Sequence, residues 1–129
     1  MNKFDLGKKA IQIKSWSWMP GMLAIFVPDI DENKSAPIKE RITESSVNKF
    51  NECNKYGNWI PDLNDPATTG CLLELVRIAS ESPCAFPENM FDSKGPYWRM
   101  RTFKKSIEIG SYRSEAELFV DVLEYFSDQ

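Results

Sequence analysis

The sequence predicts an α+β protein with a small antiparallel sheet and two main helices packed on one face of that sheet. Two segments carry clear helix signals, one at about residues 65–81 and one that begins at Ser114. The strand-like segments at 22–27 and 97–112 do not alternate regularly with these helices, as they would in a parallel α/β sheet. We expect these strands to share one sheet. The 129 residues, 42% of them hydrophobic, predict a single domain over residues 1–129.

The N-terminal part of the chain indicates strands and turns. Residues 1–15 are basic and end in Ala-Ile-Gln-Ile-Lys, whose alternation suits a strand. Residues 15–21 suggest the end of a strand followed by a turn at Pro-Gly. Residues 22–27 form a continuous apolar run, which is typical of a buried strand, and Pro28 closes it. The polar segment 29–37 predicts a loop.

The segment at 38–54 leaves two alternatives open. Ser46, Val47, Phe50 and Cys53 have helical spacing, but the residues before them do not follow it. The segment is therefore either one helix or a short strand followed by a helix.

The central helix has the most sharply marked start in the chain. Asp65 suits the N-cap and Pro66 suits the first helical position. Ser82 and Pro83 predict its end, because proline disfavours helical geometry in the residue before it. Asp62 lies upstream in a turn-forming segment, so we expect Asp62 and Asp65 to be a turn former and a cap. The alternative is a ligand-binding role for both. The helix is apolar on most sides, and its narrow polar stripe consists of Gly70, Glu74, Arg77 and Glu81.

The C-terminal part predicts a hairpin and a helix. Residues 83–96 contain three prolines and suggest irregular structure. The segments 97–103 and 107–112 have strand character and predict a hairpin. Ser114, with Glu117 three residues later, is a capping box that begins the last helix. The apolar face of this helix consists of Leu118, Phe119, Val122, Leu123 and Phe126.

The composition argues against several classes of enzyme. The chain has no histidine, so it lacks the usual general base and the partner that activates serine or cysteine nucleophiles. Its glycines are isolated and form no phosphate-binding loop. Chemistry with two carboxylates stays open, but no spacing marks such a pair. We therefore predict a non-enzymatic protein with no catalytic residue.

The cysteine spacing bears on whether the protein binds a metal, and the apolar segments bear on where in the cell it acts. Cys53, Cys71 and Cys84 form no Cys-x-x-Cys pair, which argues against a common zinc site. We expect no metal and no cofactor, and reduced thiols in a cytoplasm. The N-terminus has no signal-peptide pattern, and no apolar run reaches the length that spans a bilayer.

The sharpest candidate for ligand binding is one face of the predicted strand at 97–103. In a strand, Tyr97, Arg99, Arg101 and Phe103 point to the same side. Guanidinium groups and aromatic rings on a sheet bind phosphates and stack on bases, so this face suggests a small phosphorylated or nucleotide-like ligand. Alternatively, the arginines keep the strand soluble and pair with the acidic last helix. The sequence pI of about 5.0 argues against binding of duplex nucleic acid.

Two further features suggest binding of a partner protein. The last helix carries an acidic stripe at spacings of four, three and four, which consists of Glu117, Asp121, Glu124 and Asp128. This stripe is either a docking surface for a basic host protein or a solvated face. Trp16 and Trp18 are either interface anchors or core residues, since tryptophan is favoured in both places.

A family resemblance rests on the segment around the central helix. Pro61-Asp62-Leu63, Asp65-Pro66-Ala67-Thr68 and Gly70-Cys71-Leu72-Leu73 follow one another there, after an N-terminal Trp18-Met19-Pro20-Gly21 segment. This pattern resembles small bacteriophage and prophage proteins of unassigned function. The resemblance implies an origin and transfers no catalytic residue.

From the resemblance and the residues together we predict a small non-enzymatic phage-type accessory protein. It would act in the cytoplasm of a bacterial host by binding a host protein, with inhibition of a bacterial defence system as one form of this activity. The alternative is a binder of a small nucleotide-like ligand through the arginine-bearing strand. The sequence predicts no oligomeric state.

Overall fold

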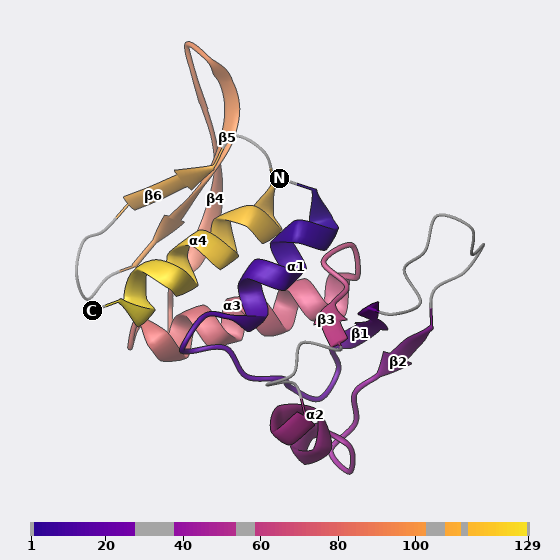
Figure 1. Cartoon of the computed structure of the whole chain (residues 1–129). Coiled ribbons are helices and arrows are strands. Elements are labelled where there is room, and N and C mark those ends of the chain that lie inside the picture. The colour runs from indigo at the N-terminus through magenta and orange to yellow at the C-terminus, as the bar shows by residue number, and fades with distance from the viewer. Residues whose placement is uncertain (1, 28–37, 54–58, 103–107, 112–113, 129) are drawn as a thin grey trace. The chain divides into compact units, whose positions relative to one another are not determined.

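The computed structural model describes residues 2–27, 38–53, 59–102, 108–111 and 114–128. These ranges contain four helices and six strands in two antiparallel sheets (Figure 1), which confirms the α+β class. Contacts divide the chain into two compact units. Unit 1 comprises Met1–Gln12 and Trp16–Cys71, and unit 2 comprises Ile13–Ser15 and Leu72–Gln129. The single domain stays a prediction, because this division does not show whether either unit folds alone.

Unit 1 is built on a sheet of three short strands. Its strand order is β2 (Lys39–Arg41), β1 (Leu23–Phe26) and β3 (Trp59–Pro61), all antiparallel, with Ala24 opposite both Glu40 and Pro61. The buried strand predicted at 22–27 is therefore confirmed as the central strand. The segment after it contains β2 followed by α2 (Val47–Cys53), so the second of the two alternatives is correct.

The strand predicted at residues 10–14 is wrong, because this segment ends the helix α1 (Lys3–Ile11). The side chain of Asn2 caps the helix by accepting a hydrogen bond from the Asp5 N–H at 2.7 Å. Leu6 and Ala10, four residues apart, are both buried, so the helical period outweighs the short alternation that suggested a strand. The described residues contain no strand at 15–17 either, but the predicted turn is present, with Gly21 at a φ of 101°.

The aromatic side chains of unit 1 form a connected series. Trp18 lies between Trp16 and Phe50, with ring centroids 5.3 Å and 5.6 Å away, respectively. Phe50 contacts Trp59 at 5.3 Å, and Trp59 contacts Phe26 at 4.9 Å. These tilted and edge-on pairs link α2 to the sheet and add to the stabilisation that burial provides.

Unit 2 holds the second sheet, in the order β4 (Phe86–Asp92), β5 (Gly95–Arg101) and β6 (Glu108–Ser111). The antiparallel pair β5–β6 confirms the predicted hairpin. The irregular structure predicted at 83–96 is wrong, because β4 spans half of that segment and β5 begins at Gly95. Its Pro87 is compatible with a strand because β4 is the edge of the sheet, where a missing N–H costs little.

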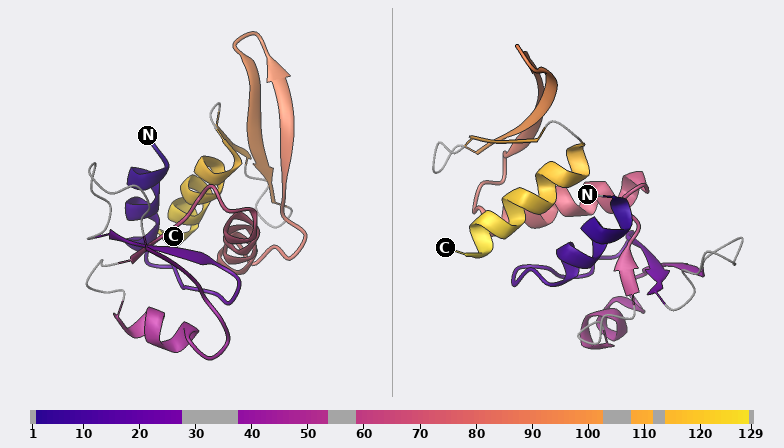
Figure 2. Two further views of the ribbon diagram at one scale, coloured as in Figure 1. Left: turned by 90° about the vertical axis from the view of Figure 1, so that its right-hand side faces the viewer. Right: turned by 45° about the horizontal axis from the view of Figure 1, so that its top comes forward.

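The expectation that strands 22–27 and 97–112 share one sheet is also wrong. Each belongs to its own three-stranded sheet, because β1 pairs with the short strands β2 and β3, which carry weak sequence signals. A helix packs on each sheet: α1 contacts β3 in unit 1, and α4 (Glu115–Ser127) contacts β5 and β6 in unit 2. Figure 2 shows these elements from two further directions.

The two predicted helices and their starts are confirmed. The central helix is α3 (Pro66–Ala79), and it begins in unit 1 and ends in unit 2. The Asp65 carboxylate accepts a hydrogen bond from the Thr68 N–H at 3.0 Å. The Ser114 hydroxyl of α4 accepts one from the Glu117 N–H at 3.1 Å. The predicted apolar face of α4 is fully buried, and its members are Leu118, Phe119, Val122, Leu123 and Phe126.

Candidate functional site

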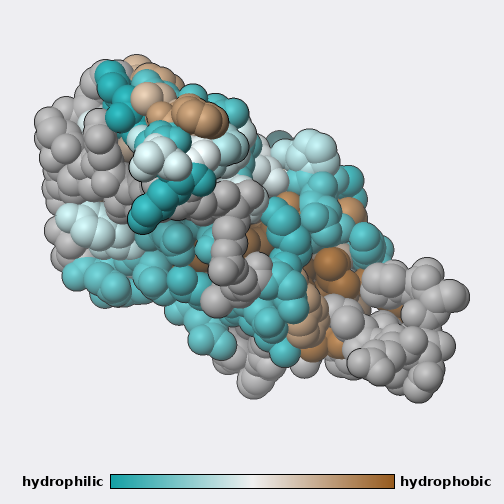
Figure 3. Space-filling model, turned by 90° about the horizontal axis from the view of Figure 1, so that it is seen from above, coloured by the Kyte–Doolittle hydropathy of each residue, from teal (hydrophilic) through white to brown (hydrophobic). Residues whose placement is uncertain are grey.

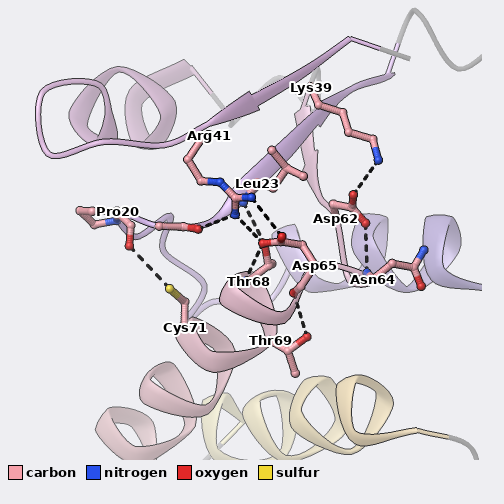
Figure 4. Close-up of polar contacts among 11 residues, drawn as sticks. Pro20, Leu23, Lys39, Arg41, Asp62, Asn64, Asp65, Thr68, Thr69 and Cys71 are labelled. Atoms are coloured by element: carbon pink, nitrogen blue, oxygen red, sulfur yellow. Dashed lines mark hydrogen bonds and ion pairs between the residues drawn. The ribbon is translucent and has the colours of Figure 1, made fainter. Parts of the chain in front are cut away.

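A polar network in unit 1 joins β2 to the start of α3 (Figure 4). Lys39 and Arg41 alternate along β2, so their side chains leave the strand on the same side. Lys39 Nζ lies 2.8 Å from Asp62 Oδ2. Arg41 holds both carboxylate oxygens of Asp65, at 2.5 Å and 3.1 Å, and also donates to the Gly21 carbonyl at 2.9 Å. Two basic residues of one strand thus bind two carboxylates that precede α3.

The two carboxylates also do what the sequence predicted of them. Asp62 accepts a hydrogen bond from the Asn64 N–H at 3.0 Å and so holds the turn, while Asp65 caps α3. Thr68 extends the network, because its hydroxyl donates to Asp65 at 2.9 Å and accepts from the Leu23 N–H at 2.8 Å. The network therefore ties the turn, the helix start and two strands together.

Electrostatics in this network favour the charged forms of both partners. The hydrogen bond from Arg41 lowers the pKa of Asp65, and hydrogen bonds from Thr68 lower it further. The hydrogen bond to Asp65 raises the pKa of Arg41. Because both oxygens of Asp65 are occupied by donors of the protein, we assign this pair to stability rather than to chemistry.

Beside the network lies an open pocket of about 210 Å³, formed by unit 1 alone. It is lined by residues of α1, β1, β2 and the turn before α3, among them Lys39, Asp62 and Asn64. Sequence reasoning missed this pocket, because its residues come from four separate segments. The alternation of Lys39 and Arg41 in the sequence indicates that their side chains share one side of a strand. It does not indicate that Asp62 and Asp65 are their partners.

The arginine-bearing strand face predicted from sequence is present on β5. Tyr97, Arg99 and Arg101 point to one side of the strand, while Phe103 lies outside the described residues. Both arginines pair with Glu88 of β4, which stands opposite Arg99 in the sheet. Arg99 Nη2 is 2.7 Å and Arg101 Nε is 3.4 Å from its carboxylate.

This pairing changes what the strand face offers to a ligand. Glu88 neutralises one of the two positive charges, and the Arg99 side chain is only 17% exposed, against 43% for Arg101. An anionic ligand would have to compete with Glu88 for both guanidinium groups. Glu88 was missed as the partner because the sequence did not predict β4.

The far end of the β4–β5 hairpin carries an apolar strip. Phe91 of β4 is opposite Pro96 of β5. Every second residue of a strand lies on the same face, so Trp98 and Met100 share the face of Pro96 and Phe91. Met100 is buried, Trp98 is half-buried, and Phe91 is 79% exposed. The strip thus continues a buried face of unit 2 into solvent. Figure 3 shows the molecule from above the view of Figure 1, and hydrophobic residues lie among hydrophilic ones on this face.

Within the described residues, only part of this hairpin is paired with a third strand. The strand β6 pairs with β5 from Trp98 to Arg101, whereas β4 pairs with β5 over its whole length, from Phe86 to Asp92. The hairpin turn is well formed, with the Lys94 N–H bound to Asp92 at 2.8 Å and Gly95 at a φ of 117°. As far as the structure describes the chain, the apolar strip therefore ends on a two-stranded arm.

The remaining candidates from sequence lie in different places. Trp18 is 1% exposed, and its backbone N–H donates to Asn51 Oδ1 at 2.7 Å, so it is a core residue, whereas Trp16 is half-buried. Three members of the acidic stripe lie on α4 and are half-buried, namely Glu117, Asp121 and Glu124. The fourth, Asp128, follows the end of α4 and is exposed. The stripe lies in unit 2 and both tryptophans in unit 1.

Within the described ranges, no three or more cysteine, aspartate or glutamate residues are grouped so that they could hold a metal ion. Among the described residues, Cys71 and Cys84 form no disulfide. The Cys71 Sγ lies 3.6 Å from the carbonyl oxygen of Pro20. Among the helices that the structure describes, none has the length and apolar character needed to cross a membrane.

Comparisons with protein-family models, with curated proteins and with solved structures found no match for this chain. The resemblance to phage proteins therefore stays a prediction from the sequence.

Proposed function

We propose that this protein acts without catalysis, by binding a host protein through the apolar strip of the β4–β5 hairpin. The observation that carries the proposal is Phe91, which is 79% exposed at the end of a strip that begins in the buried part of unit 2. Single exposed apolar residues are ordinary, but a continuous strip that includes two aromatic rings and a proline is typical of binding surfaces.

The arrangement of the strip suits a protein partner better than a small molecule. Aromatic side chains that become buried at an interface contribute a large part of the binding energy, and Phe91 and Trp98 would both lose exposed surface there. The strip lies on the arm of the hairpin. It therefore offers the edge and one face of a two-stranded sheet, which a groove of a partner protein could hold. A drug-sized ligand needs a concave site that buries most of its surface.

The proposed partner, a host protein of a bacterial defence system, follows from the resemblance to phage proteins. A phage-type accessory protein that blocks a bacterial defence system needs a binding surface and no catalytic group, which agrees with the absence of histidine. The acidic stripe of α4 would favour partners with basic surfaces and speed their association.

The experiment compares two variants that each remove one exposed apolar side chain. Phe91→Ser changes the hairpin arm, and Ile78→Ser changes an exposed position of α3 that is 64% exposed. The tagged proteins are isolated gently from a bacterial lysate and analysed by native mass spectrometry. We expect a host protein that accompanies the wild type and Ile78→Ser and is lost from Phe91→Ser.

The host protein is then purified and its affinity is measured directly. Loss of one buried aromatic anchor should weaken binding by about 2 kcal/mol, which is roughly thirtyfold. Equal affinity of Phe91→Ser and wild type, with both proteins folded, would overturn the role of the strip. Loss of a bound small molecule from an Arg99→Ala, Arg101→Ala double variant would instead favour the nucleotide-like ligand.

A further inference from the structure

The pocket beside the polar network combines an apolar wall with charged groups. The apolar wall comes from α1, β1, the end of β3 and the turn before α3, and it consists of Phe4, Ile25, Pro61 and Leu63. The polar lining comes from the start of α1, from β2 and from the same turn, and it consists of Lys3, Lys39, Asp62 and Asn64. Such a mixture of apolar surface and a few convergent polar groups is characteristic of small-molecule sites.

The charged groups of this pocket are not equivalent. Asp62 is buried, and each of its oxygens already accepts from the protein, one from the Asn64 N–H at 3.0 Å and one from Lys39 at 2.8 Å. The Lys39 side chain is 42% exposed, and an ammonium group has three donors, of which the bond to Asp62 uses one. Figure 4 shows Lys39 reaching from β2 toward Asp62 and Asn64. The pocket therefore offers donors to a ligand more readily than acceptors.

The charge balance supports the same conclusion. Lys3 and Lys39 carry two positive charges against the single negative charge of Asp62, so the lining has a net charge of +1. The side-chain amide of the exposed Asn64 adds a further donor. A ligand carboxylate would meet an ammonium group and an amide at one end, and its apolar body would meet Phe4 and Leu63.

We infer that this pocket binds a small carboxylate with an apolar body. The ligand is a free organic acid of up to about ten heavy atoms or the C-terminal residue of a polypeptide, since both present one carboxylate beside one apolar group. A ligand with so few heavy atoms makes few contacts, so a dissociation constant on the order of 1 mM is expected. The site is separate from the β4–β5 hairpin, and its test does not depend on the proposed function.

The first experiment titrates the full-length, ¹⁵N-labelled protein with phenylacetate and records amide shifts. Saturable shifts are expected at residues 25, 39 and 64. The matched neutral probe is phenylacetamide and the matched cation is phenethylamine, and both should bind at least about tenfold more weakly, because neither can pair with an ammonium group. No shifts at these amides, or equal binding of the amide or amine, would overturn the inference.

The second experiment tests the roles of the two charged residues with opposite expectations. Lys39→Gln should weaken phenylacetate binding about fivefold to tenfold, whereas Asp62→Asn should strengthen it severalfold by freeing the ammonium group from its internal partner. Asparagine also supports turns of this kind, so Asp62→Asn keeps the local fold. The control is Lys49→Gln, an exposed lysine on α2 outside the pocket, which should leave the affinity unchanged.

Unchanged affinity in a folded Lys39→Gln variant would overturn the inference, and so would weaker binding in Asp62→Asn. A third titration separates the two sources of carboxylate. A tetrapeptide that ends in phenylalanine is compared with the same peptide amidated at its C-terminus. Tighter binding of the free-acid peptide than of phenylacetate identifies a polypeptide end as the ligand. Tighter binding of phenylacetate identifies a free organic acid.

Discussion

At the scale of single residues, two glycines in helices have opposite surroundings. A Cβ added at Gly7 of α1 would lie 3.0 Å from the Pro61 carbonyl oxygen and 3.4 Å from Ile60 Cβ, so α1 approaches β3 closely at this point. A Cβ at Gly70 of α3 would meet no atom within 4 Å. The first glycine is needed for packing, and the second only weakens its helix.

We therefore predict opposite signs for two identical substitutions. Gly70→Ala should raise the free energy of unfolding by up to about 1 kcal/mol, because alanine has the higher helix propensity. Gly7→Ala gains the same propensity but crowds a backbone oxygen, and overpacking costs about 1–3 kcal/mol, so the net effect should be a loss of about 1 kcal/mol. Urea unfolding of the two variants measures both values. Stabilisation by Gly7→Ala would contradict the close packing of α1 on β3.

Asp65 unites a helix cap with an ion pair, and this makes stability depend on pH. Because Arg41 lowers the pKa of Asp65, the folded state binds this proton less tightly than the unfolded state does. The resulting stabilisation is complete above the ordinary aspartate pKa of about 4 and is lost as the pH falls through the lowered value. Acid should therefore weaken the start of α3.

We predict that Asp65→Ala lowers the free energy of unfolding at neutral pH by about 1–2 kcal/mol, chiefly through the lost cap. The difference between variant and wild type should shrink as the pH is lowered from 6 to 2. Unfolding in urea across this range provides the measurement. Arg41→Gln serves as the control, because it keeps the cap and should show a smaller deficit at neutral pH. A deficit of Asp65→Ala that does not change with pH would contradict the role of the charge.

Sequence reasoning succeeded at residues whose partners are close in the chain. The caps at Asp65 and Ser114 bind N–H groups three residues later, so the chain segment alone predicts them. It failed for Arg41 and Arg99, whose partners Asp65 and Glu88 are 24 and 11 residues away. Those pairs depend on strand registers that no local pattern encodes.

At the scale of elements, the β4–β5 hairpin differs along its length. Near Arg101 it is covered by β6 on one side and by α4, whereas its far end, the arm, pairs with no third strand among the residues that the structure describes. Two-stranded ribbons without further cover are only marginally stable in water. The arm should therefore open locally more often than the rest of the sheet.

We predict that amide hydrogens from Met90 to Tyr97 exchange at least about tenfold faster than those from Trp98 to Met100. Hydrogen exchange followed by NMR resolves the two groups. Because a bound partner would cover the apolar strip, adding the partner should slow exchange in the arm selectively. Equal protection along the whole hairpin of the free protein would show that something other than β6 stabilises the arm.

The elements that the sequence did not predict, or left as one of two alternatives, share one cause. The strand β4 contains Pro87, and β2 and β3 have only three residues each, so propensity and alternation are weak in all of them. Each is held by pairing with a stronger strand, β1 or β5. The helix α1 was missed for a related reason, since a five-residue alternation at its end concealed the spacing of Leu6 and Ala10. Tertiary partners decide such segments, and a single sequence does not name them.

At the scale of the whole molecule, the helix α3 links the two compact units. It begins at Pro66 in unit 1 and continues beyond Cys71 into unit 2, where Leu72 and Val76 are buried. Unfolding of unit 2 alone would end the helix near its first turn and remove most of its hydrogen bonds. A six-residue remnant is too short to persist as a helix in water. The dependence of α3 on unit 2 is a physical reason to expect the single domain that the sequence predicts.

We therefore predict that both units unfold together. Pulsed hydrogen exchange with mass spectrometry across a urea series follows peptides of each unit in the same sample, and their midpoints should agree. Leu72→Ala, at a fully buried position of α3 in unit 2, should cost about 2–5 kcal/mol and shift the midpoints of both units equally. A shift confined to unit 2 would show that the units unfold independently and that the chain has two domains. Under cooperative unfolding, by contrast, a partner that binds the hairpin of unit 2 also stabilises the pocket of unit 1, because anything that binds only the folded state stabilises the whole cooperative unit.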